Sequence, residues 1–178
     1  YIGFNVTRAP FNDPKLRAAL SLGMDRAGGV SAFLLGHGQT AQFPLSPSAV
    51  VYPKDLEETY SPDSYRSSME AAGYTSGEKS VSVTMLVNEE NSFKVSMARK
   101  LASDLSQYDV KIDVKALPYE DYLAALKAGG FDLYYGECKL TADWDLSPLL
   151  SPGGALNYGG VRDTQLETLL TAFRTVSE

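Results

Sequence analysis

The chain has 178 residues, of which 44% are hydrophobic and 21% are charged, and this composition excludes a wholly disordered protein. Asp and Glu number 22 and Lys and Arg 16, so the formal net charge is −6, which disfavours binding to nucleic acid or to an anionic membrane surface. The single Cys and the single His exclude an internal disulfide and a zinc site built mainly from these residues, and we expect neither a metal nor a cofactor.

The first part of the sequence predicts a short strand over residues 1–5 and then three helices. Each helix is expected to begin after a residue whose side chain can accept a hydrogen bond from a backbone N–H of the first turn. These residues are Asp13, Asp25 and Ser61. The helices are expected to end near Gly23, Leu35 and Gly73. Residues 39–60 are rich in Pro without periodicity and predict a long surface loop.

From residue 81 to residue 136 strands and helices alternate. Apolar and β-branched stretches at 81–87, 110–114 and 131–135 predict three strands. A helix from Asn91 or Ser92 to about Gln107 separates the first two, with an apolar stripe at Phe93, Met97, Leu101 and Leu105. A second helix from Pro118 separates the last two, with Tyr119 and Tyr122 turned inward. Asp163 is expected to cap a final helix that carries Leu166, Leu169, Leu170 and Phe173.

Helices between short strands indicate parallel pairing with right-handed crossovers. The predicted fold class is therefore α/β, with one open, mostly parallel sheet covered by helices. We interpret residues 1–178 as a single domain. The chain begins with Tyr1, not Met, enters a strand at once, and ends at Glu178 on the tail of a helix, so we expect a piece of a longer protein that is cut at both ends.

Candidate binding residues follow the carboxyl ends of the predicted strands, where ligands bind in open α/β sheets. Asn88 and Glu89 follow the first strand of the alternating run. Tyr134 or Tyr135 is expected to reach this edge from the last strand. Glu137 and Cys138 come directly after it, and we interpret the Cys138 thiol as inert, because only Lys139 stands beside it to activate it.

Asp143 and Asp145 flank Trp144, the only tryptophan of the chain, in the loop that follows. Three roles are open to these carboxylates. One of them can anchor a ligand amine, with Trp144 as an apolar or cation–π wall. Either can cap a short helix. The two together can act as an acid/base pair, although nothing in the sequence sets their separation.

Several segments, taken in order, resemble one known family. They are Tyr1-Ile2-Gly3-Phe4-Asn5, Ala9-Pro10-Phe11-Asn12-Asp13, Ala71-Ala72-Gly73-Tyr74, Gly130-Phe131-Asp132 and Ala142-Asp143-Trp144. In this order they are similar to the second lobe of the peptide/nickel class of extracellular solute-binding proteins of ABC importers, the oligopeptide- and dipeptide-binding type. The resemblance covers nearly the whole chain.

The resemblance implies one lobe of a periplasmic-binding-protein-like (type II) fold, whose two lobes close on a ligand about a hinge. It implies a substrate-binding component that captures peptides or a related small solute outside the membrane, without catalysis. Asp143 would hold the ligand's amino group. The expected ligand-binding residues are Asn88, Glu89, Tyr135, Glu137, Cys138, Asp143 and Trp144.

The expected partners are the ligand, the first lobe of the same parent chain and a membrane permease, and nucleic acid is not expected. The parent would be periplasmic or extracellular and tethered as a lipoprotein. Two alternatives stay open. One is the ligand-sensing domain of a transcriptional regulator built on the same lobe. The other is an α/β hydrolase that uses Asp143 and Asp145.

Overall fold

The computed structural model describes residues 1–50, 52–74, 79–106 and 109–175. In chain order, its helices and strands are β1 (Ile2–Phe4), α1 (Pro14–Leu22), α2 (Arg26–Leu34), α3 (Pro62–Ala71), β2 (Val81–Asn88), α4 (Ser92–Leu105), β3 (Val110–Leu117), α5 (Tyr119–Lys127), β4 (Leu133–Tyr135), α6 (Ser147–Leu150) and α7 (Thr164–Thr175). The predicted α/β order is confirmed. Gln107, the expected end of the long helix, lies outside the described residues.

The four strands form one sheet in the order β1-β4-β2-β3. β2 pairs in parallel with β3 on one side and with β4 on the other, as the alternating order predicted. β1 pairs antiparallel with β4, with Gly3 opposite Tyr134. The three parallel strands therefore end at the same edge of the sheet, at Asn88, Leu117 and Tyr135.

Side-chain caps set the starts of five helices at the positions that the sequence predicted. In each case the cap side chain accepts a hydrogen bond from a backbone N–H of the first turn, at 2.8 to 3.2 Å. The caps are Asp13, Asp25, Ser61, Asn91 and Asp163. Each satisfies one of the N–H groups that a helix start leaves without a partner in the helix.

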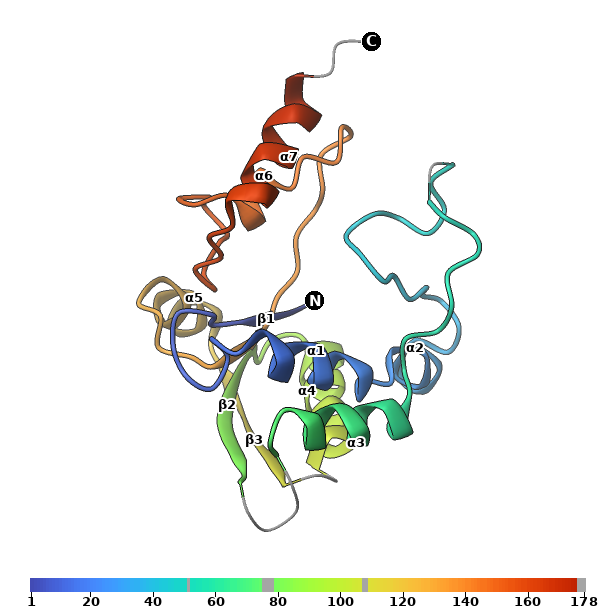
Figure 1. The fold of residues 1–178 in the computed structure, drawn as a ribbon, viewed down its shortest axis with the longest axis vertical. Coiled ribbons are helices and arrows are strands. Elements are labelled where there is room, and N and C mark those ends of the chain that lie inside the picture. Colours follow the sequence, from blue (N-terminus) through green and yellow to red (C-terminus); the bar gives the residue numbers. More distant parts are fainter. Residues whose placement is uncertain (51, 75–78, 107–108, 176–178) are drawn as a thin grey trace.

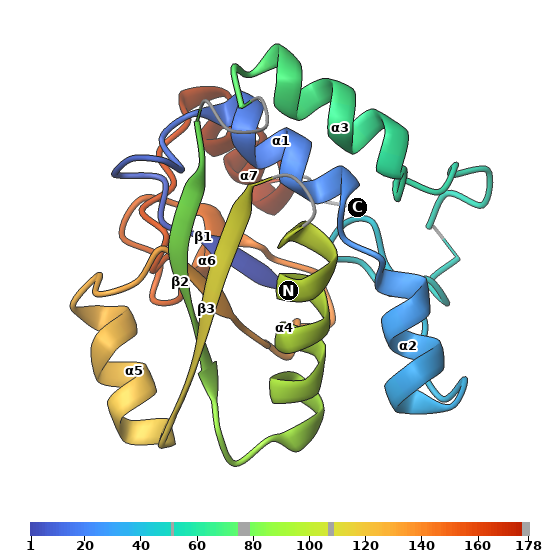
Figure 2. The same ribbon diagram turned by 90° about the horizontal axis from the view of Figure 1, so that it is seen from below.

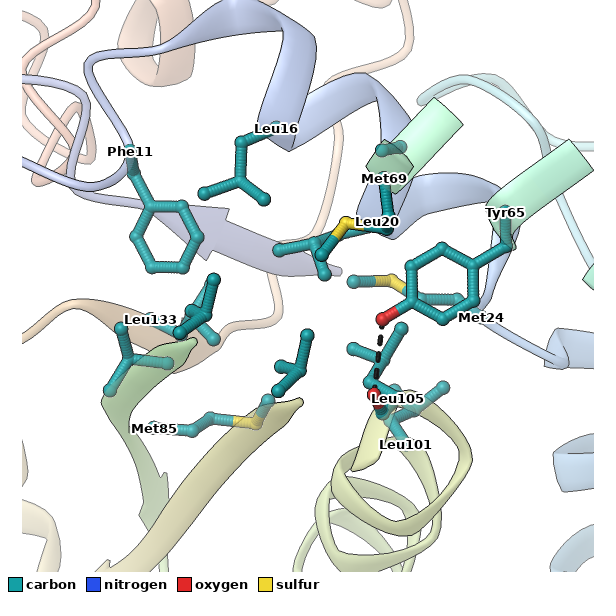
Figure 3. Close-up of a cluster of buried hydrophobic side chains, with 14 of the residues drawn as sticks. Phe11, Leu16, Leu20, Met24, Tyr65, Met69, Met85, Leu101, Leu105 and Leu133 are labelled. Carbon is teal, nitrogen blue, oxygen red and sulfur yellow. Dashed lines mark hydrogen bonds between the residues drawn. The ribbon is translucent and has the colours of Figure 1, made fainter. Parts of the chain in front are cut away.

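Both faces of the sheet are covered, because successive side chains of a strand point to opposite faces. Val81, Val83, Met85 and Val87 of β2 pack in the larger cluster with α1, α3 and α4, whereas Leu86 packs in a smaller cluster with α5. Figure 2 shows α5 on one side of β2 and β3 and α4 on the other. In the larger cluster the buried Tyr65 hydroxyl donates a hydrogen bond to the Leu105 carbonyl oxygen at 3.0 Å (Figure 3).

Two segments extend beyond the sheet. The chain leaves β4, runs away from the sheet and carries α6 and α7 to the far end of the molecule (Figure 1). The described part of the predicted loop, residues 39–50 and 52–60, also extends past the sheet. None of the helices in the described part of the chain is both long and apolar enough to cross a bilayer.

One expectation about inward-facing residues is wrong, and the last helix is mostly exposed. Tyr119 is 55% exposed, because it is the first residue of α5 and lies at the end of that helix. Tyr122, one turn further, is buried as predicted. In α7 only Leu170 is buried among the described residues of the helix, and Leu169 and Phe173 are more than half exposed. Too little of the described chain packs beside the apolar face of α7 to cover it.

Candidate functional site

A hollow of about 760 Å³ lies at the edge of the sheet where the parallel strands end. Asn88 at the end of β2, the start of α4, one side of α5 and residues 136–139 after β4 form its walls. Tyr1, Glu90, Tyr134, Leu156 and Tyr158 also line it. The position agrees with the general rule for open α/β sheets, because the strand ends leave loops and helix starts free to meet a ligand.

Aromatic rings form much of the hollow's wall. The ring of Tyr134 meets those of Tyr1, Phe131 and Tyr158 edge-on, with centroid separations of 5.8, 5.1 and 6.0 Å. Gly3 makes this cluster possible. A Cβ atom there would lie within 3.0 Å of three ring carbons of Tyr134, so the ring can cross the neighbouring strand only because Gly3 has no side chain.

The tyrosine hydroxyls of the hollow are neutral groups. Burial raises the pKa of the Tyr1, Tyr122 and Tyr134 hydroxyls above the ordinary tyrosine value. The Tyr122 hydroxyl donates to the Tyr135 carbonyl oxygen at 2.8 Å. These groups can shape a pocket and form hydrogen bonds, but none of the three is set up as a proton acceptor at neutral pH.

One ion pair lies in the wall of the hollow. The Lys94 ammonium and the Glu137 carboxylate are 2.6 Å apart. The two side chains differ in exposure, since that of Lys94 is 10% exposed and that of Glu137 is 71% exposed. The cation is therefore held by the protein, whereas its counter-ion stands at the solvent side.

The rim of the hollow is polar, and its side chains are hydrogen-bonded to helix starts. Asn88 accepts a hydrogen bond from the Asn91 N–H at 3.2 Å, and Asn91 in turn caps α4. Glu90 accepts a hydrogen bond from the N–H of Tyr119 at 3.0 Å and so caps α5 from another segment. The starts of α4 and α5 are thereby tied to the loop that follows β2.

The structure brings together only some of the predicted site residues. Asn88, Glu137 and Cys138 line the hollow. Glu89, Tyr135, Asp143 and Trp144 are not among its lining residues. Tyr135 packs against the cluster on the opposite face, and Tyr134 takes the place in the hollow, because the two alternate along β4.

Sequence reasoning missed Lys94, and a signal for it was present. Lys94 is spaced four, seven and eleven residues before Ala98, Leu101 and Leu105, all of which are buried. A lysine on the apolar stripe of a helix is a departure from the usual pattern. Tyr158, which also lines the hollow, comes from a loop without periodicity and carried no comparable signal.

The Asp143–Trp144–Asp145 segment lies between β4 and α6. Asp145 caps the short helix, since its carboxylate accepts hydrogen bonds from the N–H and the hydroxyl of Ser147 at 2.9 and 2.5 Å. These bonds lower the pKa of Asp145. A hydrogen bond from Thr141 lowers the pKa of the exposed Asp143 carboxylate. Asp145 therefore has the capping role, and Asp143 stays a charged group open to solvent.

The described residues offer no cluster of three or more His, Cys, Asp and Glu side chains that could hold a metal ion. Cys138 is a free, half-buried thiol. His37 is exposed in the turn that follows α2, where its N–H donates to the Leu34 carbonyl oxygen at 2.8 Å.

Comparison with known proteins points to one family. The model of the bacterial extracellular solute-binding proteins, family 5 (middle), matches residues 1–155. Heme-binding protein A of Haemophilus influenzae is 28% identical over 177 residues, which are 96% of this chain and 32% of that protein. Glutathione-binding protein GsiB of Pectobacterium atrosepticum is 28% identical over 188 residues, which are 98% of this chain and 36% of that protein.

Solved structures share the fold. The oligopeptide-binding protein AppA from Bacillus subtilis, in complex with a nonapeptide, superposes with a TM-score of 0.88 at 22% identity, covering 100% of this chain and 39% of AppA. NikZ from Campylobacter jejuni, in complex with Ni(L-His), gives 0.85 at 20% identity, covering 99% of this chain and 38% of NikZ. The predicted fold class, that of part of a type II periplasmic binding protein, is thereby confirmed. The chain spans about a third of the length of the curated relatives it matches.

Proposed function

The chain belongs to family 5 of the bacterial extracellular solute-binding proteins, and from this membership we propose that it forms the ligand-binding lobe of a receptor for an ABC importer. The membership confirms the resemblance that the sequence motifs predicted. In this proposal residues 1–178 are one domain of a two-lobed parent. The receptor captures a peptide or a related small solute and delivers it to a permease in the membrane.

The hollow at the ends of β2, β3 and β4 is the observation that carries the proposal. Its lining comes from five separate parts of the chain, namely Tyr1 and residues within 88–94, 119–126, 134–139 and 156–158. Polar groups and helix starts surround an aromatic interior, which is the composition of a small-molecule site. A second lobe that closes over it about a hinge would exclude water and complete the contacts.

The ligand class follows from the groups that this lobe offers. Tyrosine rings can pack against apolar or planar parts of a ligand without demanding one shape, and bridging water can fill the remaining space. Asp143, charged and solvent-facing, stays the proposed anchor of a ligand amine. Peptides suit both features. Heme, glutathione, a nonapeptide and Ni(L-His), the ligands named for similar proteins, define the range to be tested.

Location and reaction type complete the proposal. The family is one of extracellular binding proteins, so the parent would act outside the membrane, in the periplasm or at the cell surface as a lipoprotein. Binding and release without catalysis agree with the neutral tyrosines of the hollow. The hydrolase alternative needs Asp143 and Asp145 to act as an acid/base pair. Asp145 is instead hydrogen-bonded to Ser147 at the start of α6, which does not favour that role.

Calorimetry on the full-length protein that contains this chain tests the proposal. The probes are a tetrapeptide library, glutathione, heme and nickel–histidine. We expect one of these classes to bind with a dissociation constant of about 10 μM or lower, whereas a protein without a solute site would bind none. Mass spectrometry of the protein purified under native conditions identifies any ligand that it retains. Absence of binding throughout the panel would contradict the proposal.

A further inference from the structure

Lys94 occupies a place in α4 that is unfavourable for a cation on two counts. It is the third residue of the helix, where the aligned peptide dipoles favour negative charge. The residue is also buried, at 8% exposure, in a place where a charge needs a partner. Departures of this kind from local rules are expected at functional sites.

The partner of Lys94 is held much less firmly than Lys94 itself. Glu137 lies just beyond β4 with 71% of its side chain exposed, and a rotation about its side-chain bonds can return the carboxylate to water at little cost. Lys94 is less free to turn away, because its backbone belongs to α4 and its side chain is only 10% exposed. The pair therefore has a fixed cation and an exchangeable anion.

The charges around the hollow show what such an exchange would do. Lys94, Lys139, Glu90 and Glu137 line it, so their formal charges cancel while Glu137 faces inward. Glu90 is engaged with the start of α5. When Glu137 turns away, the remaining lining charges leave the hollow with one net positive charge beside neutral tyrosines.

We infer that Lys94 binds a carboxylate of the ligand and that Glu137 is the counter-ion which this carboxylate displaces. The inference rests on the function proposed above and assigns a further specificity residue within it. A carboxylate that enters the hollow replaces one charged partner of the ammonium with another, so the cation is never left buried and unpaired. Glu137 meanwhile stays in contact with solvent, because 71% of its side chain is already exposed. In the empty receptor the Glu137 carboxylate occupies the place beside Lys94 that the ligand carboxylate takes on binding.

The alternative role for Glu137 is direct contact with a ligand amine, and it predicts the opposite effect of removing the charge. If Glu137 competes with the ligand, Glu137→Gln strengthens binding. If Glu137 holds the ligand, the same substitution weakens binding. Lys94→Met shortens the side chain by one atom, keeps its unbranched apolar stem and removes the charge, so it weakens binding only where the ligand's anion meets the ammonium.

The experiment uses the full-length receptor and a tetrapeptide library with free carboxylates. Affinity-selection mass spectrometry identifies the peptide that is retained most tightly. Each carboxylate of that peptide is then replaced in turn by a carboxamide. Calorimetry gives the dissociation constants of all forms for the wild type, Lys94→Met and Glu137→Gln. Lys15→Met on α1 and Glu120→Gln on α5 are matched controls that lie outside the hollow lining.

In the wild type we expect one carboxamide replacement to weaken binding about tenfold or more, the size of a lost charge-assisted hydrogen bond. In Lys94→Met the same replacement should change affinity less than about threefold. Glu137→Gln should bind the carboxylate form about threefold tighter or more and the carboxamide form with little change. The controls should match the wild type. Thermal unfolding of each variant verifies the fold, and Lys94→Gln replaces Lys94→Met if the latter does not fold.

Weaker binding by Glu137→Gln, or a full carboxylate preference in Lys94→Met, would overturn the inference and leave the proposed function standing. The same holds if no carboxamide replacement changes the wild-type affinity. If the wild type retains no peptide at all, peptide binding itself fails, and the assignment of Lys94 falls with it.

Discussion

Substitution of Gly3 by Ala tests how β1 shapes the hollow. A Cβ atom at this position would lie within 3.0 Å of three carbons of the Tyr134 ring. The ring cannot yield easily, because it is 4% exposed and meets the rings of Tyr1, Phe131 and Tyr158. We therefore expect Gly3→Ala to force the ring out of the hollow's wall.

The cost of Gly3→Ala is the difference of two terms. Overpacking of a filled site costs roughly 1–3 kcal/mol. Replacement of a glycine by alanine where the backbone permits it stabilises by about 0.4–1 kcal/mol, because the unfolded chain loses freedom. The net loss is then about 1–2 kcal/mol, which for a domain of this size lowers the melting temperature by roughly 2–8 °C.

Urea unfolding followed by far-ultraviolet circular dichroism measures this loss, and near-ultraviolet dichroism reports the tyrosine packing. The decisive comparison is with Tyr134→Leu. In that background the new Cβ atom has room, so Gly3→Ala should be neutral or stabilising. Gly130→Ala is the matched control, since a Cβ atom there meets only the Ala125 carbonyl oxygen, at 3.6 Å. An equal cost of Gly3→Ala in both backgrounds would refute the steric argument.

Three further outcomes follow from side chains whose contacts are defined. In calorimetry on the full-length receptor, Asp143→Asn should weaken binding of a peptide with a free amino terminus about tenfold and leave the affinity for the N-acetylated peptide unchanged. Equal effects on both peptides would show that Asp143 does not contact the ligand amine. Asp25 caps α2 and meets Lys100 at 3.1 Å. Although burial opposes it, hydrogen bonding from Gly28 and Lys100 lowers the pKa of Asp25, so its contribution to stability is present above about pH 4 and is lost as the pH falls through that lowered value. Asp25→Asn can still cap α2, so it should reduce the difference in unfolding free energy between pH 3 and pH 7, measured by urea unfolding. At pH 7 it should destabilise less than Asp25→Ala, which also removes the cap and so costs about 1 kcal/mol more. An unchanged difference between the two pH values would contradict this. Tyr65→Phe should cost about 1–2 kcal/mol in the same assay, since the buried Leu105 carbonyl oxygen loses its donor, and a neutral substitution would show that water replaces it.

Much of the fold could be predicted because its signals are local. A cap side chain reaches N–H groups only two or three residues ahead, so Asp13, Asp25, Ser61, Asn91 and Asp163 mark helix starts without reference to the rest of the molecule. The alternation of strand and helix between residues 81 and 136 likewise requires parallel pairing, because a helix between two strands returns the chain to the same end of the sheet.

Which side chains of a helix are buried could be predicted less well from the sequence. Periodicity identifies the apolar side of a helix but not whether anything lies against it. Tyr119 and Tyr122 have the same spacing as a core stripe, yet the first is exposed at the start of α5. Leu169 and Phe173 of α7 are exposed for a related reason, since the apolar face of that helix has little of this chain beside it.

By itself, the sequence determined the α/β class, the order of the elements and the edge of the sheet where a binding site would lie. It could not decide which side chains meet there. The choice of Tyr134 over Tyr135 depends on which face of β4 carries the hollow, and the pairing of Lys94 with Glu137 joins residues 43 positions apart. Caps and periods act within a few residues, whereas the face of a strand and the partner of a charge are set by packing between distant segments, which only the tertiary structure specifies.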